Sequence, residues 1–130
     1  MEFSFPKNHK GYKEIIVQPK DTAASYGSGL IEVYATPAMV GLMESTAQQS
    51  LISHLPEGFI TLGIEINVKH IKATLIGDTV QCHSTLVEVS GKKLLFEIQA
   101  NDSKGIIGTA THWRYIVHQK EFFEKLIDAK

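Results

Sequence analysis

The sequence has one cysteine among 130 residues, Cys82, and none of the common metal or nucleotide motifs. A single thiol cannot form an internal disulfide, and nothing around it indicates a reactive group. HExxH, CxxC, P-loop and G-x-S-x-G patterns are all absent. Cys82 and His83 are adjacent on a predicted strand and point to opposite faces, so they cannot hold one metal ion. We therefore expect no metal, no disulfide and no nucleophile elbow.

Excess charge and long apolar runs are missing as well. Lys and Arg total 13 against 14 for Asp and Glu, a net charge of -1, which gives no electrostatic basis for nucleic-acid binding. No apolar run approaches the roughly 18 residues that a membrane span needs. Residues 1–10 are polar and lack the apolar segment of a signal peptide. The expectation is a cytoplasmic protein with neither a nucleic-acid nor a membrane partner.

The composition fits one globular domain over residues 1–130, because 43% of the residues are hydrophobic and the length allows one core but not two. Hydrophobic periodicity predicts a helix from a Thr36 N-cap, with Pro37 at the first helical position, to about His54. Period-two patterns predict strands, and the other elements are a polar, mobile loop and a short C-terminal helix. The strands are expected at Tyr12–Gln18, around Leu62–His70, at Thr79–Val89, around Leu94–Ala100 and at Ile106–His118, the loop at Lys20–Gly29 and the last helix around Phe122–Ile127.

One long helix followed by a meander of four antiparallel strands predicts an α+β fold, in which a curved sheet wraps around the helix. The first half of the helix, Ala38–Met43, is so apolar that it needs cover on most of its circumference. The sheet can supply much of that cover, and a partner subunit could supply the rest.

Glu44 interrupts this apolar helix. With a period of 3.6 residues it falls in the predicted core-facing stripe of Val40, Ala47, Leu51 and Leu55. Burial removes solvation from a carboxylate, which costs free energy unless the group is paired or used chemically. A solvated glutamate on the helix surface is the alternative interpretation. A buried Glu44 is a candidate for acid/base or nucleophilic chemistry on an acyl group.

His70 and Thr36 are further candidates. His70 continues the strand face of Ile66 and Val68 that is expected to look toward the helix, where an imidazole could relay a proton or hold a carboxylate charged. A histidine that reaches solvent at the strand end is the alternative. Thr36 is first of all a helix-start residue, although its hydroxyl lies at the positive end of the helix dipole, which favours an oxyanion. It is roughly 12 Å from Glu44 along the helix, so direct contact is not expected.

Gly63 lies inside a predicted strand, where glycine marks either a bulge or the close approach of a ligand or backbone. Arg114 shares a face of the last strand with His112. An inward Arg114 would offer planar donors to a phosphate or a carboxylate. An arginine on the surface, paired with an acidic neighbour, is the alternative.

The stretch Tyr34–Glu44, Y-A-T-P-A-M-V-G-L-M-E, resembles the start of the fluoroacetyl-CoA thioesterase-like family. The resemblance extends over nearly the whole chain, through Leu62–His70, the Gly77-Asp78 turn and Gly108–Arg114. It implies a hot-dog fold, an antiparallel sheet wrapped around one long central helix, and hydrolysis of an acyl-CoA thioester. It also implies a homodimer, because hot-dog protomers usually pair edge to edge with their active sites at the interface.

The resemblance implies that Thr36, Glu44 and His70 are catalytic and that Gly63 and Arg114 line the substrate site. It implies neither a metal nor a bound cofactor, because coenzyme A enters as part of the substrate.

The segment Lys20–Leu30 is short and rich in Gly, Ala and Ser, which does not support an aromatic gate selecting a fluorinated acyl group. The acyl group therefore stays open, with a short or medium chain expected. Three other functions stay open as well: a non-catalytic acyl-CoA or acyl-carrier binding module, an enoyl-CoA hydratase and a purely structural pairing domain.

Overall fold

The computed structural model describes residues 2–129. The elements are β1 (Lys10–Ile16), η1 (Pro19–Asp21), α1 (Ala23–Tyr26), α2 (Thr36–Leu51), η2 (Ile52–His54), β2 (Phe59–His70), β3 (Thr79–Ser90), β4 (Lys93–Asp102), β5 (Gly105–His118) and α3 (Gln119–Asp128). The first strand begins and ends two residues before the predicted bounds, and its end coincides with Val17 N–H donating to the Asp78 carbonyl at 2.9 Å.

The segment expected to be a mobile loop, Lys20–Gly29, instead contains the short helices η1 and α1. The Thr22 side chain caps α1 by accepting a hydrogen bond from the Ser25 N–H at 3.2 Å. Gly27 ends the helix with φ 73°, a left-handed conformation that glycine adopts without steric cost. Local capping therefore orders a stretch whose composition alone favoured a loop.

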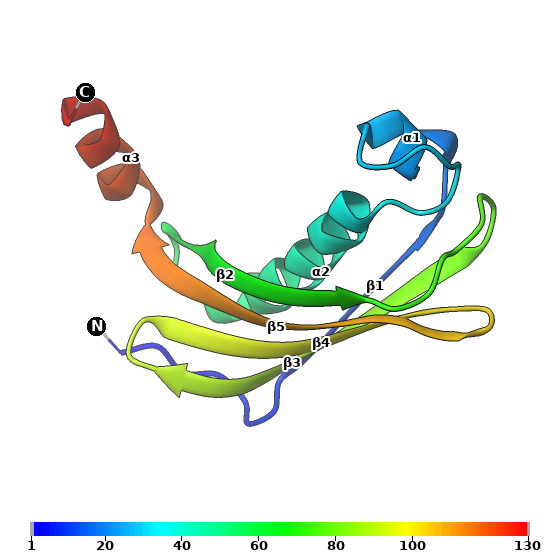
Figure 1. Cartoon of the computed structure of the whole chain (residues 1–130). Coiled ribbons are helices and arrows are strands. Elements are labelled where there is room, and N and C mark those ends of the chain that lie inside the picture. Colours follow the sequence, from blue (N-terminus) through cyan, green and yellow to red (C-terminus); the bar gives the residue numbers. More distant parts are fainter. Residues whose placement is uncertain (1, 130) are drawn as a thin grey trace.

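The five strands form one antiparallel sheet in the order β1-β3-β4-β5-β2, curved around α2 (Figure 1). The predicted α+β hot-dog architecture is confirmed. The predicted meander of four strands is wrong in one respect, because β2 pairs with β5 and not with β3. Tight antiparallel hairpins need short turns, and the connection over residues 71–78 is too long to impose one. As a result β2 forms one edge of the sheet and β1 the other.

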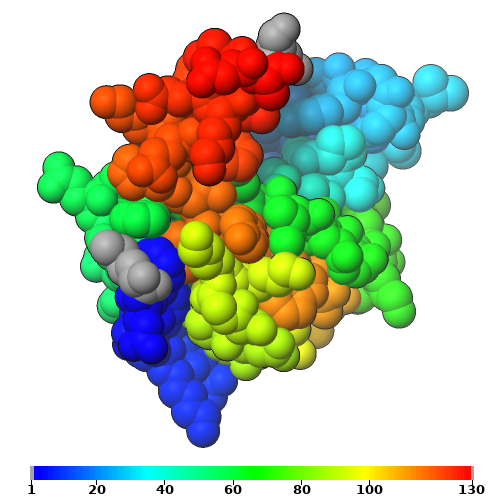
Figure 2. All heavy atoms as spheres, turned by 90° about the vertical axis from the view of Figure 1, so that its left-hand side faces the viewer, coloured from blue at the N-terminus to red at the C-terminus, as the bar shows by residue number. Residues whose placement is uncertain are grey.

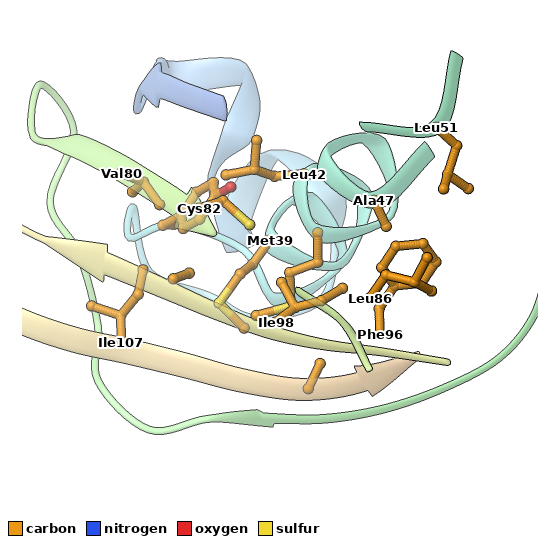
Figure 3. Close-up of a cluster of buried hydrophobic side chains, with 14 of the residues drawn as sticks. Met39, Leu42, Ala47, Leu51, Val80, Cys82, Leu86, Phe96, Ile98 and Ile107 are labelled. Carbon is orange, nitrogen blue, oxygen red and sulfur yellow. The ribbon is translucent and has the colours of Figure 1, made fainter. Parts of the chain in front are cut away.

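The core lies between α2 and the concave face of the sheet, mainly against β1, β3 and β4 (Figure 3). The buried residues of α2 are Met39, Leu42, Met43, Thr46, Ala47 and Leu51. The predicted stripe is thus partly wrong, since Val40 and Leu55 are only half-buried and Glu44 lies at the border of the buried face. Thr46 takes a core position because its hydroxyl donates to the Leu42 carbonyl at 2.7 Å, which satisfies its polar group within the helix.

A β-bulge in β2 decides which of its side chains face the helix. The register pairs Gly63 with Arg114 and then skips one residue, so Ile64 has no partner in β5 and is 53% exposed. Paired residues lie on the same face of a sheet, so Gly63 faces α2 with Arg114, whereas Leu62 faces outward with Tyr115. The prediction that even-numbered residues of this strand face the helix is therefore correct only after the bulge, because the inserted residue reverses the alternation of side chains.

The predicted C-terminal helix is present as α3, which continues from β5 and stands clear of the sheet (Figures 1 and 2). All of its described residues are exposed. An apolar groove of about 750 Å³ lies between α3 and β2, lined by Ile60, Leu62, Phe122, Phe123 and Leu126 among others. None of the helices within residues 2–129 is long and apolar enough to cross a bilayer.

Candidate active site

Thr36 is the first residue of α2, and its hydroxyl points away from the helix terminus. The N-cap is Ala35, which has extended backbone angles and makes no side-chain cap hydrogen bond, so the predicted capping role of Thr36 is wrong. Pro37 follows in the first turn, where its missing N–H costs no helical hydrogen bond. Because the Thr36 hydroxyl does not cap the helix, it is free to bond elsewhere, and its Oγ1 lies 2.8 Å from Nδ1 of His70.

His70 closes the inward face of β2 and is half-buried. Burial lowers the pKa of its imidazole below 6.5, while the nearby backbone of Lys72 acts in the opposite direction. Nε2 of the ring is buried without a hydrogen-bond partner among the described residues, and the Tyr34 ring packs edge-on at 6.4 Å between centroids. The alternative of a solvated histidine at the strand end is therefore wrong. A neutral imidazole held against a hydroxyl can accept or return a proton near neutral pH.

A cavity of about 340 Å³ opens beside this pair. Thr36 and His70 line it together with Tyr34, Lys72 and Ala23 of α1. The polar pair therefore faces a space that a small molecule can enter, bordered by the short helix that the sequence pattern did not predict.

Glu44 lies further along α2, half-buried, and faces the bulge in β2. Three polar side chains converge on the point where a Cβ at Gly63 would lie. Glu44 Oε2 is 2.8 Å from that point, His112 Cε1 is 3.0 Å away and Arg114 Nη1 is 3.4 Å away. Both sequence interpretations of Gly63 therefore hold, because the residue adjoins a bulge and also permits close approach.

Arg114 is the sole arginine of the chain and is only 6% exposed. Its Nε donates to Thr61 Oγ1 at 2.8 Å, its Nη2 to the Thr61 carbonyl at 3.0 Å, and its Nη1 to His112 Nε2 at 3.0 Å. Burial lowers the pKa of Arg114, whereas the nearby Glu44 carboxylate raises it. The alternative of a surface arginine is wrong, and the inward guanidinium is held in one orientation by contacts on three of its nitrogen atoms.

His112 joins this group, and the sequence interpretation gave it no role. It is 1% exposed, and its Nδ1 donates to the Glu65 carbonyl at 2.8 Å. Burial is the main cause that lowers its pKa, and the charge of Arg114 lowers it further, while the Glu65 backbone and Glu44 act in the opposite direction. The period-two pattern did place His112 on the face of Arg114; the missing information was that this face of β5 lies opposite Glu44.

The predicted residues thus form two clusters along α2. Thr36 and His70 make one, and Glu44, Gly63 and Arg114 make the other, roughly 12 Å further along the helix by Cα rise. Within residues 2–129 no hydrogen bond joins Glu44 to His70, and the imidazole beside the carboxylate is that of His112. No group of three or more potential ligands in this described part of the chain gathers around one point suited to a metal ion.

A five-stranded antiparallel sheet curved around one long helix is the architecture of the hot-dog fold. A family profile described as fluoroacetyl-CoA-specific thioesterase matches residues 17–120. The chain belongs to this family of thioester hydrolases.

Individual relatives agree with this assignment. The chain is 38% identical to the fluoroacetyl-CoA thioesterase of Streptantibioticus cattleyicolor over 95 residues, which cover 73% of this chain and 68% of the relative. A variant of the fluoroacetyl-CoA-specific thioesterase FlK, solved in complex with fluoroacetate and CoA, superposes with a TM-score of 0.85 at 31% identity over 91% of this chain and 99% of that one. A hot-dog-like protein from Thermanaerovibrio acidaminovorans gives a TM-score of 0.88 at 25% identity over 96% and 93% of the two chains.

Proposed function

We propose that this protein hydrolyses a short or medium acyl-CoA thioester in the cytoplasm to the free acid and CoA, without a metal or a bound cofactor. The observation that carries the proposal is the convergence of Glu44, His112 and Arg114 on the side-chain-free position of Gly63. A carboxylate next to a fixed cation suits a carbonyl carbon that gains negative charge on its oxygen.

Glu44 supplies the attack on the thioester. Its carboxylate adds to the carbonyl carbon directly, or it takes a proton from a water molecule that adds instead. In either route the C–S bond breaks and the CoA thiolate leaves. Direct attack leaves a mixed anhydride between Glu44 and the acyl group, which water then hydrolyses to the free acid and the original carboxylate. The half-buried carboxylate, which approaches Gly63 together with Arg114, supports this role.

The Thr36–His70 pair acts on the leaving group. The departing thiolate needs a proton. An imidazole that has taken one up from solvent can deliver it through the Thr36 hydroxyl and an intervening water, since the two clusters lie roughly 12 Å apart along α2. The adjoining cavity, lined by both residues, supports a CoA arm passing this end of α2 while the acyl carbonyl sits beside Glu44. A substrate extended along the helix would then contact both clusters.

The bulge in β2 can hold the oxyanion. Ile64 has no register partner in β5, and we propose that a backbone N–H at this bulge donates to a substrate oxygen next to Gly63. Losing one such donor typically removes about 3 kcal/mol of transition-state stabilisation. Arg114 positions the acyl group with its remaining N–H donors.

The decisive assay is thiol release from a panel of acyl-CoA esters, including acetyl-, fluoroacetyl-, butyryl- and hexanoyl-CoA. Fluoroacetyl-CoA is included because the relatives are named for it. We expect release of CoA at least about a hundredfold above the uncatalysed rate for one or more of the esters. Tight binding of an ester without thiol release would instead indicate a non-catalytic binding module. Hydration of an enoyl-CoA without thiol release would indicate a hydratase.

We also propose a homodimer that pairs through the β2 edge. This edge of the sheet has unpaired backbone groups, which favour the addition of another strand. The site opens toward it, since Thr36 and Gly63 are exposed while Ile64 presents an apolar side chain to solvent. Pairing there would cover the site and the part of α2 that β2 does not cover.

Sedimentation velocity is expected to give twice the mass of one chain. Ile64→Lys introduces a charge at the proposed interface and should shift the protein to the monomer. Ile16→Lys is the matched control, because Ile16 lies on the opposite edge strand with nearly the same exposure, 54% against 53%. A monomeric wild type, or dissociation caused equally by both variants, would contradict pairing through β2.

A further inference from the structure

The hydrogen bonds of His112 determine where its proton lies. Nδ1 faces the Glu65 carbonyl at 2.8 Å, and a carbonyl oxygen only accepts, so Nδ1 carries the hydrogen. Nε2 faces Arg114 Nη1 at 3.0 Å, and a guanidinium only donates, so Nε2 offers its lone pair. The two partners thus select one neutral tautomer of a side chain that is 1% exposed.

This tautomer restrains Arg114. A guanidinium has five N–H donors, and here Thr61 accepts two and His112 accepts one. One N–H on each terminal nitrogen is left for other partners, and Nη1 lies on the side of Gly63 that Glu44 also approaches. Because the guanidinium is rigid and planar, Thr61 fixes the edge that contains Nε and Nη2. The contact of Nη1 with His112 adds the restraint against a tilt about that edge.

We propose that His112 is a positioning residue, whose neutral ring fixes the Arg114 guanidinium so that its remaining N–H donors point at the acyl group beside Glu44. This inference rests on the proposed thioester hydrolysis, and it adds a residue that acts through Arg114. Its support is geometric: a fully buried ring, a single consistent tautomer and a direct bond to the only arginine of the chain.

Protonation would dismantle this arrangement. A hydrogen on Nε2 removes the acceptor for Arg114 and places two cations in contact. The groups around the ring are Arg114 on β5, Glu44 on α2, the Glu65 carbonyl on β2 and the Phe96 ring on β4 at 6.3 Å. Because burial lowers the pKa of His112, the neutral form persists at neutral pH and is lost only as the pH falls through that lowered value.

Three substitutions separate the two hydrogen bonds. In His112→Gln the amide oxygen can lie about where Nε2 lies and still accept from Arg114. In His112→Asn the shorter side chain places its amide nitrogen about where Nδ1 lies, so it can still donate to Glu65 but not reach Arg114. His112→Leu can make neither hydrogen bond. We expect His112→Leu and His112→Asn to lower kcat/KM about tenfold to a hundredfold, chiefly through KM, and His112→Gln to stay within about fivefold of wild type. An Asn variant as active as the Gln variant would overturn the proposal, because the Arg114 contact would then be dispensable.

A double-variant cycle tests whether His112 acts through Arg114. Lysine cannot reproduce the planar contacts, so Arg114→Lys alone should lower kcat/KM. Adding His112→Leu to Arg114→Lys should then lower it less than twofold further, since the partner is already lost. The same full loss in both backgrounds would show an independent structural role and overturn the proposal.

Heteronuclear NMR of the resting protein gives a readout that does not depend on activity. We expect the His112 ring to be in the Nδ1–H tautomer, with a pKa below 6.5. This pKa should rise when Arg114 is replaced, and it should rise less in Arg114→Lys, which keeps a positive charge, than in Arg114→Leu, which does not. The acid limb of wild-type kcat/KM should contain a step at this pKa that His112→Gln lacks. An Nε2–H tautomer would overturn the positioning role, whereas the expected tautomer in a protein that cleaves no acyl-CoA would instead reject the proposed function.

Discussion

Replacing Glu44 by Gln is expected to reduce thiol release from the best acyl-CoA substrate by about a thousandfold, while the protein stays folded. The amide has nearly the shape of the carboxylate, so packing against the bulge is preserved. It cannot add to a carbonyl carbon as an anion or take a proton from water at neutral pH. Because Glu44 is half-buried beside Arg114, the change removes the reactive charge and little else. The measurement is kcat/KM with a thiol reagent, alongside thermal unfolding.

Glu97→Gln is the matched control for this substitution. Glu97 lies exposed on β4, and its position alternates with the buried Phe96 and Ile98, so it faces away from α2. Glu97→Gln removes one negative charge from the protein, as Glu44→Gln does, and should leave kcat/KM within about twofold of wild type. Equal activity in the Glu44→Gln variant and the wild type would reject Glu44 as the reacting group, and with it the mechanism proposed above.

Local sequence signals sufficed for the elements that form the hot-dog fold. The apolar helix after Thr36-Pro37 and the period-two runs of the later strands reflect the 3.6-residue and two-residue repeats of side-chain direction, which depend on near neighbours alone. Strand order does not depend on near neighbours. The position of β2 at the sheet edge follows from its pairing with β5, whose partner residues are 38 (His70 and Gly108) to 59 (Phe59 and His118) positions away, and no periodicity within β2 reports that pairing.

The same distinction separates the parts of the site. Glu44, Thr36 and His70 could be named from the sequence pattern and the family resemblance, but not their grouping, because the grouping depends on how β2 and β5 lie along α2. His112 is an example: the pattern placed it on one face of β5 with Arg114 but did not indicate that this face lies opposite Glu44. Tertiary contacts of this kind decide which polar residues become partners, so they are the step at which sequence reasoning ends.

A single methyl group added at Gly63 is expected to act directly on Glu44. Gly63→Ala would place a Cβ 2.8 Å from Glu44 Oε2 and 3.0 Å from His112 Cε1, closer than carbon atoms pack in proteins. His112 is held by Glu65 and Arg114, so the flexible end of Glu44 has to move instead. A displacement of about 1 Å at a reacting group can cost about a hundredfold, which is the expected loss in kcat/KM. The backbone of Gly63 is not in the left-handed region, so the variant should still fold.

Gly41→Ala is the control for the loss of a glycine, since nothing lies within 4 Å of the added Cβ on the exposed side of α2. It should leave kcat/KM unchanged and stabilise the helix by about 1 kcal/mol. Combining Gly63→Ala with Glu44→Gln then tests the cause. If the methyl group acts by displacing the carboxylate, it should lower the residual activity of Glu44→Gln less than twofold, because the group it displaces no longer reacts. A hundredfold loss in that background as well would place the damage elsewhere, in the backbone donor of the bulge or in Arg114.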